Sequence, residues 1–257
     1  MSIYQHFRED ERSLVDQALT WKEEVKDYYK ERLTDFLDPR EQEILKTIVG
    51  IDEDVQLSFF GGRGDIERQR AHLAPSYIEA DEETFACLLY SVEYPSKFVT
   101  LAHRDILGAL MSIGLKREKF GDIIINGTDI QVILAKEVAS YVEVNLTSIG
   151  KATIQLKRLP FSAQSELVDS WNERSGTISS LRLDAVLAEI YRVSRSKIEP
   201  YLTKGYVKVN WKVVENGSFQ VKETDHFSVR GFGRSQLVSL DGKTKKDKWK
   251  IQYRLKV

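Results

Sequence analysis

The residues best suited to hold a charged ligand lie in the C-terminal third of the chain, at Ser194-Arg195-Ser196-Lys197. Ser194 is placed to cap a helix, so Arg195 and Lys197 fall in the first turn of that helix. A helix N-terminus favours negative charge, and two cations there need an anionic partner or full solvation. A phosphate group would satisfy both the free amides and the cations. The pattern therefore predicts a phosphate-binding helix end.

Two predicted helices and a small sheet position these residues. The first helix is predicted from apolar residues that share one face, namely Leu183, Val186, Leu187 and Ile190. The second helix begins after Ser194 and runs to about Lys204, and Gly205 supplies the left-handed residue that ends it. Alternation of apolar and polar residues then predicts short strands, first at Val207-Lys208-Val209-Asn210 and later around Val213, Val214, Phe227 and Val229.

This order of elements resembles the S4 RNA-binding domain, also called the alpha-L motif. The motifs that carry the resemblance are Arg182-Leu183-Asp184, Ser194-Arg195-Ser196, Lys204-Gly205, Val207-Lys208-Val209-Asn210 and a closing Asp225 to Gly231. Two positions depart from the family pattern. Pro200 falls inside the second helix, where a missing amide is expected to kink or shorten it, and Trp211 follows Asn210 where the family usually turns with glycine.

The charge of the chain is strongly polarised. Residues 174–257 contain 18 lysines and arginines against 8 acidic residues, a formal charge of +10, whereas residues 1–173 contain 20 against 31, or −11. A basic module can be steered toward nucleic acid while the acidic remainder limits non-specific adhesion. The alternative is that the basic third is merely soluble.

Length and composition exclude several classes of protein. With 257 residues, 42% hydrophobic and 30% charged, the chain is expected to form two or three small domains. No apolar run approaches the roughly 18 residues of a membrane span, and Met1–Asp10 lacks the pattern of an export signal. A single cysteine, Cys87, excludes an internal disulfide and a multi-cysteine metal site. We therefore expect a cytoplasmic protein that has no membrane partner.

Residues 1–75 are predicted to form a helical N-terminal domain. Helices are expected from residue 2 to about 50, with a strong start at Asp38-Pro39-Arg40-Glu41. A strand is predicted over Val55–Phe60, followed by the glycine loop Gly61-Gly62-Arg63-Gly64 and a helix-compatible stretch to His72. Such a loop can cradle a nucleotide, but this one lacks the Walker Lys-Ser/Thr and the dinucleotide spacing, so an ordinary tight loop is favoured.

Residues 76–160 are predicted to form a ferredoxin-like or RNA-recognition-motif-like domain. The expected βαββαβ order is strand 85–94, helix 103–113, strand 123–126, strand 130–134, helix 136–144 and strand 152–156, with a turn at Asn126-Gly127. The aromatic strand signature of true RNA-recognition motifs is missing, so stacking of single-stranded RNA on this sheet is left open.

Residues 161–180 are predicted to be a connector with a short helix or strand, and residues 181–257 the S4-type domain. Its basic loop, Gly242-Lys243-Thr244-Lys245-Lys246-Asp247-Lys248, lies between alternating segments and predicts a hairpin. A charge run is often only a solvated loop. Beside the second helix, however, this loop would extend a phosphate-binding surface.

The chain as a whole resembles the bacterial YlmH family, from the helical head and Phe59-Phe60-Gly61-Gly62 through Gly121-Asp122-Ile123 to the S4 module. The resemblance implies an RNA-binding protein of the cytoplasm whose relatives engage the large ribosomal subunit carrying peptidyl-tRNA. It also implies a link to ribosome-associated quality control and, by gene neighbourhood, to cell division.

The motifs of the enzymes that carry S4 modules are missing. A tyrosyl-tRNA synthetase needs His-rich and Lys-Met-Ser-Lys-type adenylate motifs, and a pseudouridine synthase needs a catalytic aspartate in a separate domain. Asp184 instead lies within the S4 helix and is expected to be structural, paired with Arg182 or with a neighbouring cation. The four histidines are too scattered for a metal site. We therefore expect no catalysis, cofactor or metal, with an RNA-modifying enzyme as the least favoured alternative.

The predicted function is non-enzymatic binding of structured RNA within an α+β multidomain fold, with ribosomal RNA of the large subunit as the first expected partner and tRNA as the second. Phosphate contacts are expected to dominate over base contacts. The predicted RNA-binding residues are Arg182, Ser194, Arg195, Ser196, Lys197, Lys204, Lys208, Asn210, Lys212, Arg230, Arg234, Lys243, Lys245 and Lys246. The competing hypothesis is an interaction scaffold in which residues 1–75 dock a protein partner.

Overall fold

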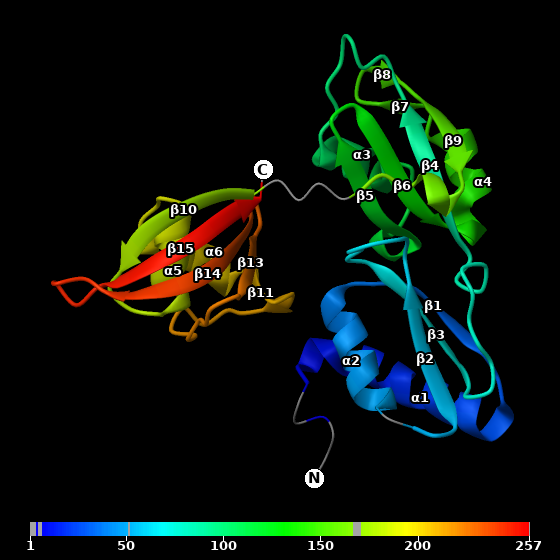
Figure 1. Ribbon diagram of the computed structural model, residues 1–257, viewed down its shortest axis with the longest axis horizontal. Coiled ribbons are helices and arrows are strands. Elements are labelled where there is room, and N and C mark those ends of the chain that lie inside the picture. The colour runs from blue at the N-terminus through cyan, green and yellow to red at the C-terminus, as the bar shows by residue number, and fades with distance from the viewer. Residues whose placement is uncertain (1–3, 5–6, 51, 167–170, 257) are drawn as a thin grey trace. The chain divides into compact units, whose positions relative to one another are not determined.

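The computed structural model describes residue 4 and residues 7–50, 52–166 and 171–256. The chain divides into two compact units, residues 1–168 and 169–257. None of the described helices is both long and apolar enough to cross a membrane. Figure 1 labels the helices and strands in chain order.

The first part of unit 1 combines helices with a three-stranded sheet. Its elements are the 3-10 turn Glu9–Glu11, α1 (Arg12–Tyr28), β1 (Arg32–Leu37), α2 (Pro39–Val49), β2 (Val55–Phe60) and β3 (Gln69–Pro75). The strands are ordered β1-β3-β2, and both pairs are antiparallel. Asp38 and Glu41 form the predicted capping box at the start of α2. Helices α1 and α2 share one core with this sheet, which includes Val15, Ala18, Ile44, Leu45 and Leu73.

Two expectations for this region are wrong. Residues 2–50 are not all helical, because Arg32–Leu37 forms β1, and the stretch before His72 is not a helix, because Gln69–Pro75 forms β3. Strand β3 is buried along most of its length, and its polar residues are buried as well. The Arg70 guanidinium contacts Glu137 at 3.1 Å, and His72 Nε2 lies 2.9 Å from Glu31. Arg70 and His72 are buried but reach acidic partners that are partly exposed, so this buried strand has a polar composition that resembles that of a surface helix.

The second part of unit 1 has the predicted βαββαβ order. Its elements are β4 (Cys87–Glu93), α3 (His103–Ser112), the 3-10 turn Arg117–Lys119, β5 (Phe120–Asn126), β6 (Asp129–Ala135), α4 (Lys136–Asn145), the short pair β7 (Ser148–Ile149) and β8 (Ala152–Thr153), β9 (Gln155–Leu159) and the 3-10 turn Phe161–Ala163. The sheet order β5-β6-β4-β9 is that of a ferredoxin-like fold, which confirms the prediction. Gly127, at φ +62°, forms the expected turn between β5 and β6.

The two faces of this sheet have different cores. Residues of α3 and α4, such as Ile106 and Val142, pack on one face with Tyr90 and Phe120. On the other face, Leu89 and Ile133 pack with residues from the first part of the unit, and that second core also includes Phe36, Phe60, Ile66 and Phe85. The sheet face opposite the helices is therefore covered by the N-terminal part of the chain.

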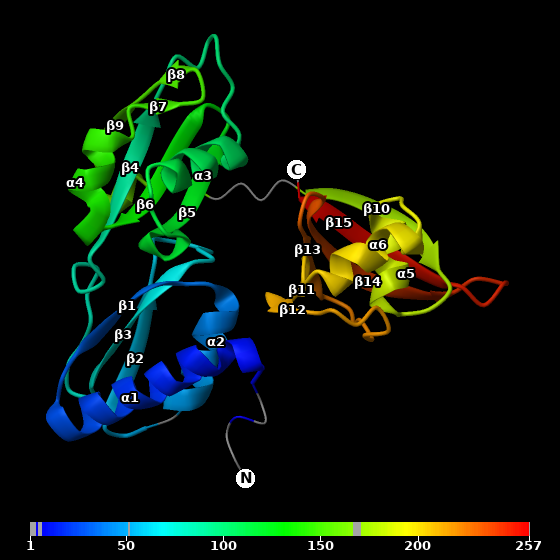
Figure 2. The same ribbon diagram turned by 180° about the vertical axis from the view of Figure 1, so that it is seen from behind.

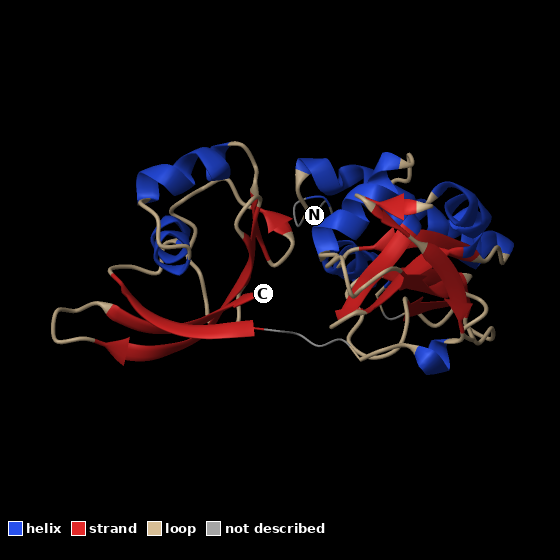
Figure 3. Cartoon of the chain, turned by 90° about the horizontal axis from the view of Figure 1, so that it is seen from above, coloured by secondary structure: helices blue, strands red, loops and turns tan. Residues whose placement is uncertain are grey.

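Unit 2 is a six-stranded antiparallel sheet with two helices. Its elements are β10 (Trp171–Ile178), α5 (Leu183–Ile190), α6 (Arg195–Thr203), β11 (Val207–Val209), β12 (Lys212–Val213), β13 (His226–Val229), β14 (Gly233–Lys243) and β15 (Trp249–Lys256), with the sheet order β10-β15-β14-β13-β11-β12. Figure 3 shows both helices of this unit on one side of its sheet. Their core includes Val186, Ile198, Phe227, Leu237 and Tyr253.

The S4-type prediction is confirmed in its main elements, including the two helices, β11 and the β14–β15 hairpin. Gly205 ends the second helix at φ +67°. Pro200 lies inside α6, which still runs to Thr203. Strand β10 pairs with β15 along its whole length, so this unit begins earlier in the chain than residue 181. The part of the predicted connector at residues 167–170 lies outside the described residues.

Candidate nucleic-acid interface

The N-terminus of α6 presents the basic tetrapeptide that the sequence singled out. Ser194 occupies the N-cap position, but its side chain makes no cap hydrogen bond. Its hydroxyl instead lies 2.8 Å from that of Ser196, so the predicted side-chain cap is wrong. Ser194, Arg195, Ser196 and Lys197 are all exposed. This helix end therefore offers hydroxyls and cations together to a ligand in solvent.

Arg182 and Arg195 both act on the carboxylate of Asp184. Arg182 donates two hydrogen bonds to Asp184, from Nε at 3.1 Å and from Nη2 at 2.9 Å. These bonds hold the pKa of Asp184 below its usual range, against its partial burial, and the charge of Arg195 lowers it further. The expected structural role of Asp184 is confirmed. Arg182 keeps 42% of its side chain exposed, so one edge of its guanidinium faces solvent.

Sheet register brings the basic hairpin to the same end of unit 2. Strand β10 ends at Ile178, which pairs with Trp249, and Trp249 pairs with Lys243 on β14. Arg195 Nη2 donates to the hydroxyl of Ser179, the residue after Ile178, at 2.9 Å. The first turn of α6 therefore lies beside the sheet end from which the hairpin projects, as Figure 1 shows for that hairpin.

We call this region the basic end. Its members are Arg182, Ser194, Arg195, Ser196, Lys197, Lys243, Lys245 and Lys246. The Lys243 ammonium lies 2.7 Å from Asp247 and 5.2 Å from the centre of the Trp249 ring, which fixes the base of the hairpin. Lys245 and Lys246 are exposed at its tip.

Other predicted residues lie elsewhere. Asn210 and Trp211 form the two-residue turn between β11 and β12, at φ +48° and +64°. The Asn210 amide donates to Asp225 at 2.9 Å and accepts from the backbone N–H of His226 at 2.9 Å, so it closes this turn within the chain. Figure 2 shows β11 and β12 at the end of the sheet opposite the hairpin.

The remaining predicted residues are dispersed around these elements. They are Lys204 after α6, half-buried Lys208 and Lys212 on β11 and β12, and exposed Arg230 and Arg234 around the turn into β14. The Arg230 guanidinium lies 4.8 Å from the centre of the Tyr206 ring. Only part of the predicted set is thus gathered at the basic end.

The glycine loop of unit 1 is folded tightly against the ferredoxin-like sheet. The amide of Gln164 accepts from Arg63 N at 2.8 Å and donates to Arg63 O at 2.7 Å. Farther along the loop, Asp122 accepts from the backbone N–H groups of Glu67 and Arg68 at 2.7 and 3.2 Å. A β-carbon on Gly62 would lie 2.9 Å from Ile133 Cδ1 and 2.8 Å from Gln164 Oε1. The glycines therefore allow close packing, which supports the tight-loop interpretation.

A metal-binding cluster or an activated thiol among the described residues would indicate catalysis. Among those residues, no group of three or more His, Cys, Asp or Glu side chains could hold a metal ion. Burial raises the pKa of the Cys87 thiol to about 12, so at neutral pH it is not a thiolate nucleophile.

Sequence reasoning missed several cationic and aromatic residues on the sheet of unit 2, namely Trp171, His226, Arg254 and Lys256. Trp171 fell in the predicted connector, and Arg254 and Lys256 alternate with core residues of β15. That alternation was the signal available to find them.

A sheet and two helices of this topology, with cations at adjacent helix ends, define an S4-type RNA-binding protein. Residues 181–227 match the S4 domain, and residues 80–163 match the family described as a putative RNA-binding domain in YlmH. The chain is 49% identical over 251 residues to the ribosome-associated protein quality control protein P2 of Bacillus subtilis (strain 168), covering 98% of this chain and 97% of that protein. The chain therefore belongs to the YlmH family of S4-domain RNA-binding proteins.

A solved structure gives a second comparison. The cell division protein ylmH from Streptococcus pneumoniae is 28% identical, with a TM-score of 0.55, and the match covers 64% of this chain and 100% of that one. This similarity supports the α+β architecture described above.

Proposed function

We propose that this protein binds structured RNA on the ribosome and catalyses no reaction. The observation that carries the proposal is the basic end, where cations from α5, α6 and the β14–β15 hairpin are held at one end of the sheet by intramolecular contacts. Family membership and the name of the B. subtilis relative support the ribosome as the place of binding.

Binding is governed by phosphates rather than by base identity. Arg195 and Lys197 contact phosphate oxygens directly, and Arg182 contributes the edge of its guanidinium that Asp184 leaves exposed. Lys245 and Lys246 extend the contact along the RNA backbone. A paired guanidinium fork suits two phosphate oxygens better than an ammonium does, so Arg195→Lys weakens binding although the charge is unchanged.

The RNA partner in this proposal is the large ribosomal subunit that carries peptidyl-tRNA, in a step of ribosome-associated quality control. The structure from S. pneumoniae bears a cell division name, and a connection of this chain to division would be indirect, through translation.

The test is a titration of an rRNA hairpin with the full-length protein at several salt concentrations. The variant is Arg195→Ala with Lys197→Ala, because both side chains are exposed and Arg182 must be kept to pair with Asp184. Because two phosphate contacts are lost, the negative slope of log K for RNA binding against log salt becomes shallower by roughly 1.5. Binding at low salt also becomes weaker.

The matched control removes two exposed lysines of unit 1, Lys97→Ala with Lys151→Ala, which leaves the basic end intact. Equal salt slopes for the wild type and the basic-end variant would contradict the proposal. If both double variants lost the same amount of affinity for the rRNA hairpin, overall charge alone would explain the binding.

A further inference from the structure

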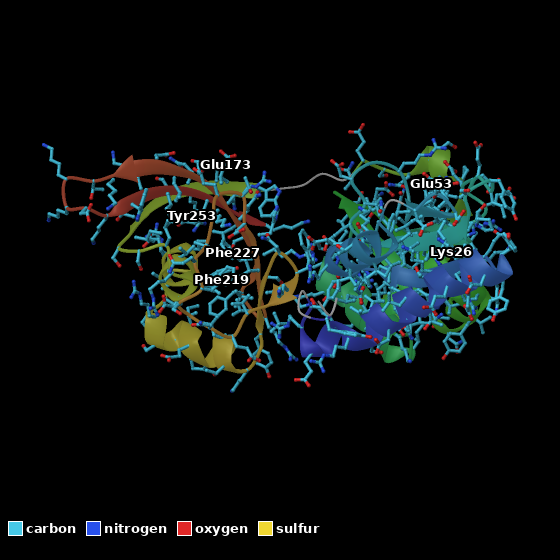
Figure 4. All side chains as sticks on the ribbon, turned by 90° about the horizontal axis from the view of Figure 1, so that it is seen from below. Lys26, Glu53, Glu173, Phe219, Phe227 and Tyr253 are labelled. Atoms are coloured by element: carbon cyan, nitrogen blue, oxygen red, sulfur yellow. The ribbon has the colours of Figure 1, made fainter. Side chains whose placement is uncertain are left out.

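The face of the unit 2 sheet that points away from its helices carries a row of polar and charged residues. Glu173 pairs with Arg254, Arg254 with Gln236, and Gln236 with His226, so these four side chains lie on one face. Their neighbours Tyr253, Leu237 and Phe227 are fully buried on the other face, against α5 and α6. Figure 4 shows Glu173 on the opposite side of the sheet from Tyr253 and Phe227.

Three aromatic rings are arranged along this outer face, at the end opposite the hairpin. The rings of Trp211 and His226 are in contact in a tilted arrangement, with centroids 5.5 Å apart and planes inclined by 31°. The ring of Trp171 lies 6.4 Å from His226. Arg254 Cζ lies 4.5 Å from the centre of the Trp171 ring and Lys256 Nζ lies 5.9 Å from it. We call Trp171, Trp211, His226, Arg254 and Lys256 the outer-face cluster.

Gln236 holds this cluster in place. Its Oε1 accepts from Arg254 Nε at 2.6 Å, so its amide nitrogen is the donor toward Thr224 O at 3.0 Å and His226 Nε2 at 2.9 Å. The imidazole and the guanidinium are thus both fixed by one nearly buried amide. Fixed rings lose little conformational freedom when a planar ligand stacks on them.

The charge of this face selects the ligand. Register places further cations on it, because Lys208 pairs with Ser228, Ser228 with Arg234, and Lys250 with Thr177. With Arg254 and Lys256 these make five cations, against the carboxylates of Glu173 and of Asp241, which is bonded to Gln252. Aromatic and guanidinium planes for stacking, surrounded by cations, suit unpaired nucleotides.

From these contacts we propose that the outer-face cluster is a second RNA-binding site, which stacks unpaired bases on Trp171 and Trp211 while Arg254 and Lys256 hold the adjoining phosphates. It rests on the proposed function but differs from the basic end in its ligand, since the basic end binds paired, structured RNA. Trp171, Arg254 and Lys256 also lie outside the residues matched to the S4 domain.

The experiment compares a short unstructured oligoadenylate with the rRNA hairpin as probes of the full-length protein. Trp171→Leu keeps apolar bulk but removes the ring, and it is expected to weaken oligoadenylate binding about 5- to 150-fold, the effect of one stacked base. Trp171→Phe keeps a ring and should retain most of the affinity. Hairpin binding stays within about twofold in both variants, because the basic end is untouched.

Tryptophan emission gives a direct readout of stacking. A protein with Trp21→Phe and Trp249→Phe retains Trp171 and Trp211 as its two tryptophans. Oligoadenylate should quench their emission in proportion to binding, whereas the Arg195→Ala, Lys197→Ala variant should show the same quenching and lose only hairpin affinity.

Two results would overturn this proposal. One is undiminished oligoadenylate affinity in a folded Trp171→Leu protein together with unquenched emission in the two-tryptophan protein. The other is displacement of oligoadenylate by a glutamate-rich peptide at equal concentration, which would identify an acidic protein segment as the partner. If the Arg195→Ala, Lys197→Ala variant loses only the affinity for the rRNA hairpin, the proposal for the outer-face cluster is supported. Failures of the two proposals are therefore distinguishable.

Discussion

Replacing Gly62 by alanine should destabilise unit 1 strongly, because the glycine loop is a packing device. Gly62 has φ +128°, which costs an alanine of order 1–3 kcal/mol. Its new β-carbon would lie 2.9 Å from Ile133 Cδ1 and 2.8 Å from Gln164 Oε1, and overpacking of this kind typically costs about 1–3 kcal/mol. Together these effects predict a loss of about 2–4 kcal/mol in the free energy of unfolding, since the side chains can relax in part.

Gly64→Ala is the matched control in the same loop. Gly64 has φ +74°, but nothing lies within 4 Å of a β-carbon placed on it, so only the backbone cost of about 1 kcal/mol remains. The measurement is hydrogen exchange of the β4 and β6 amides, with thermal unfolding, where a loss of 2–4 kcal/mol corresponds to a melting temperature lower by roughly 5–15 °C. Equal losses of stability in Gly62→Ala and Gly64→Ala would show that close packing does not explain the glycine at position 62. Stabilisation of the wild type by nucleotides would indicate instead that this loop binds a nucleotide.

Two further substitutions test the contacts that hold each unit. In Asp184→Asn the pair with Arg182 is weakened; because the folded-state pKa of Asp184 is lowered, its stabilisation is present above pH about 4 and lost as the pH falls. Unfolding of wild type and variant should therefore differ at pH 7 and converge near pH 2, and a constant difference would contradict the pairing. Arg70→Met removes the buried guanidinium that donates to Thr34 O at 2.7 Å and contacts Glu137 at 3.1 Å, and the carbonyl left without its donor predicts a loss of about 1–3 kcal/mol in urea unfolding. Arg104→Met, at an exposed arginine, should change stability by less than about 0.5 kcal/mol.

The ferredoxin-like domain and the S4 elements could be predicted because their periodicity agrees with their burial. The β5–β6 hairpin follows from apolar strands around Asn126-Gly127, and α6 follows from Ser194 at its N-cap position and Gly205 after its last turn. Strand β3 could not be found in this way, because Arg70 and His72 are buried through partners that are distant in sequence. The prediction that residues 1–75 form a separate domain stays a prediction.

The candidate site was predictable in part. The basic tetrapeptide that begins at Ser194 and the pair Arg182–Asp184 could be predicted from the sequence, because the residues of each feature lie within a few positions of one another. The proximity of the hairpin to Arg195 depends on the register of β10 with β15, which alternation alone does not fix. Asn210 was chosen for its polar group, but that group closes the turn.

In the proposed function, the basic end holds this protein on ribosomal RNA. The most direct test of this binding is crosslinking with sequencing in cells, comparing wild type with the Arg195→Ala, Lys197→Ala protein at equal abundance. We predict wild-type crosslinks concentrated on large-subunit rRNA and tRNA, and their loss in the variant. Crosslinks that are diffuse, or that persist unchanged in the variant, would show that the basic end is not the surface that binds ribosomal RNA.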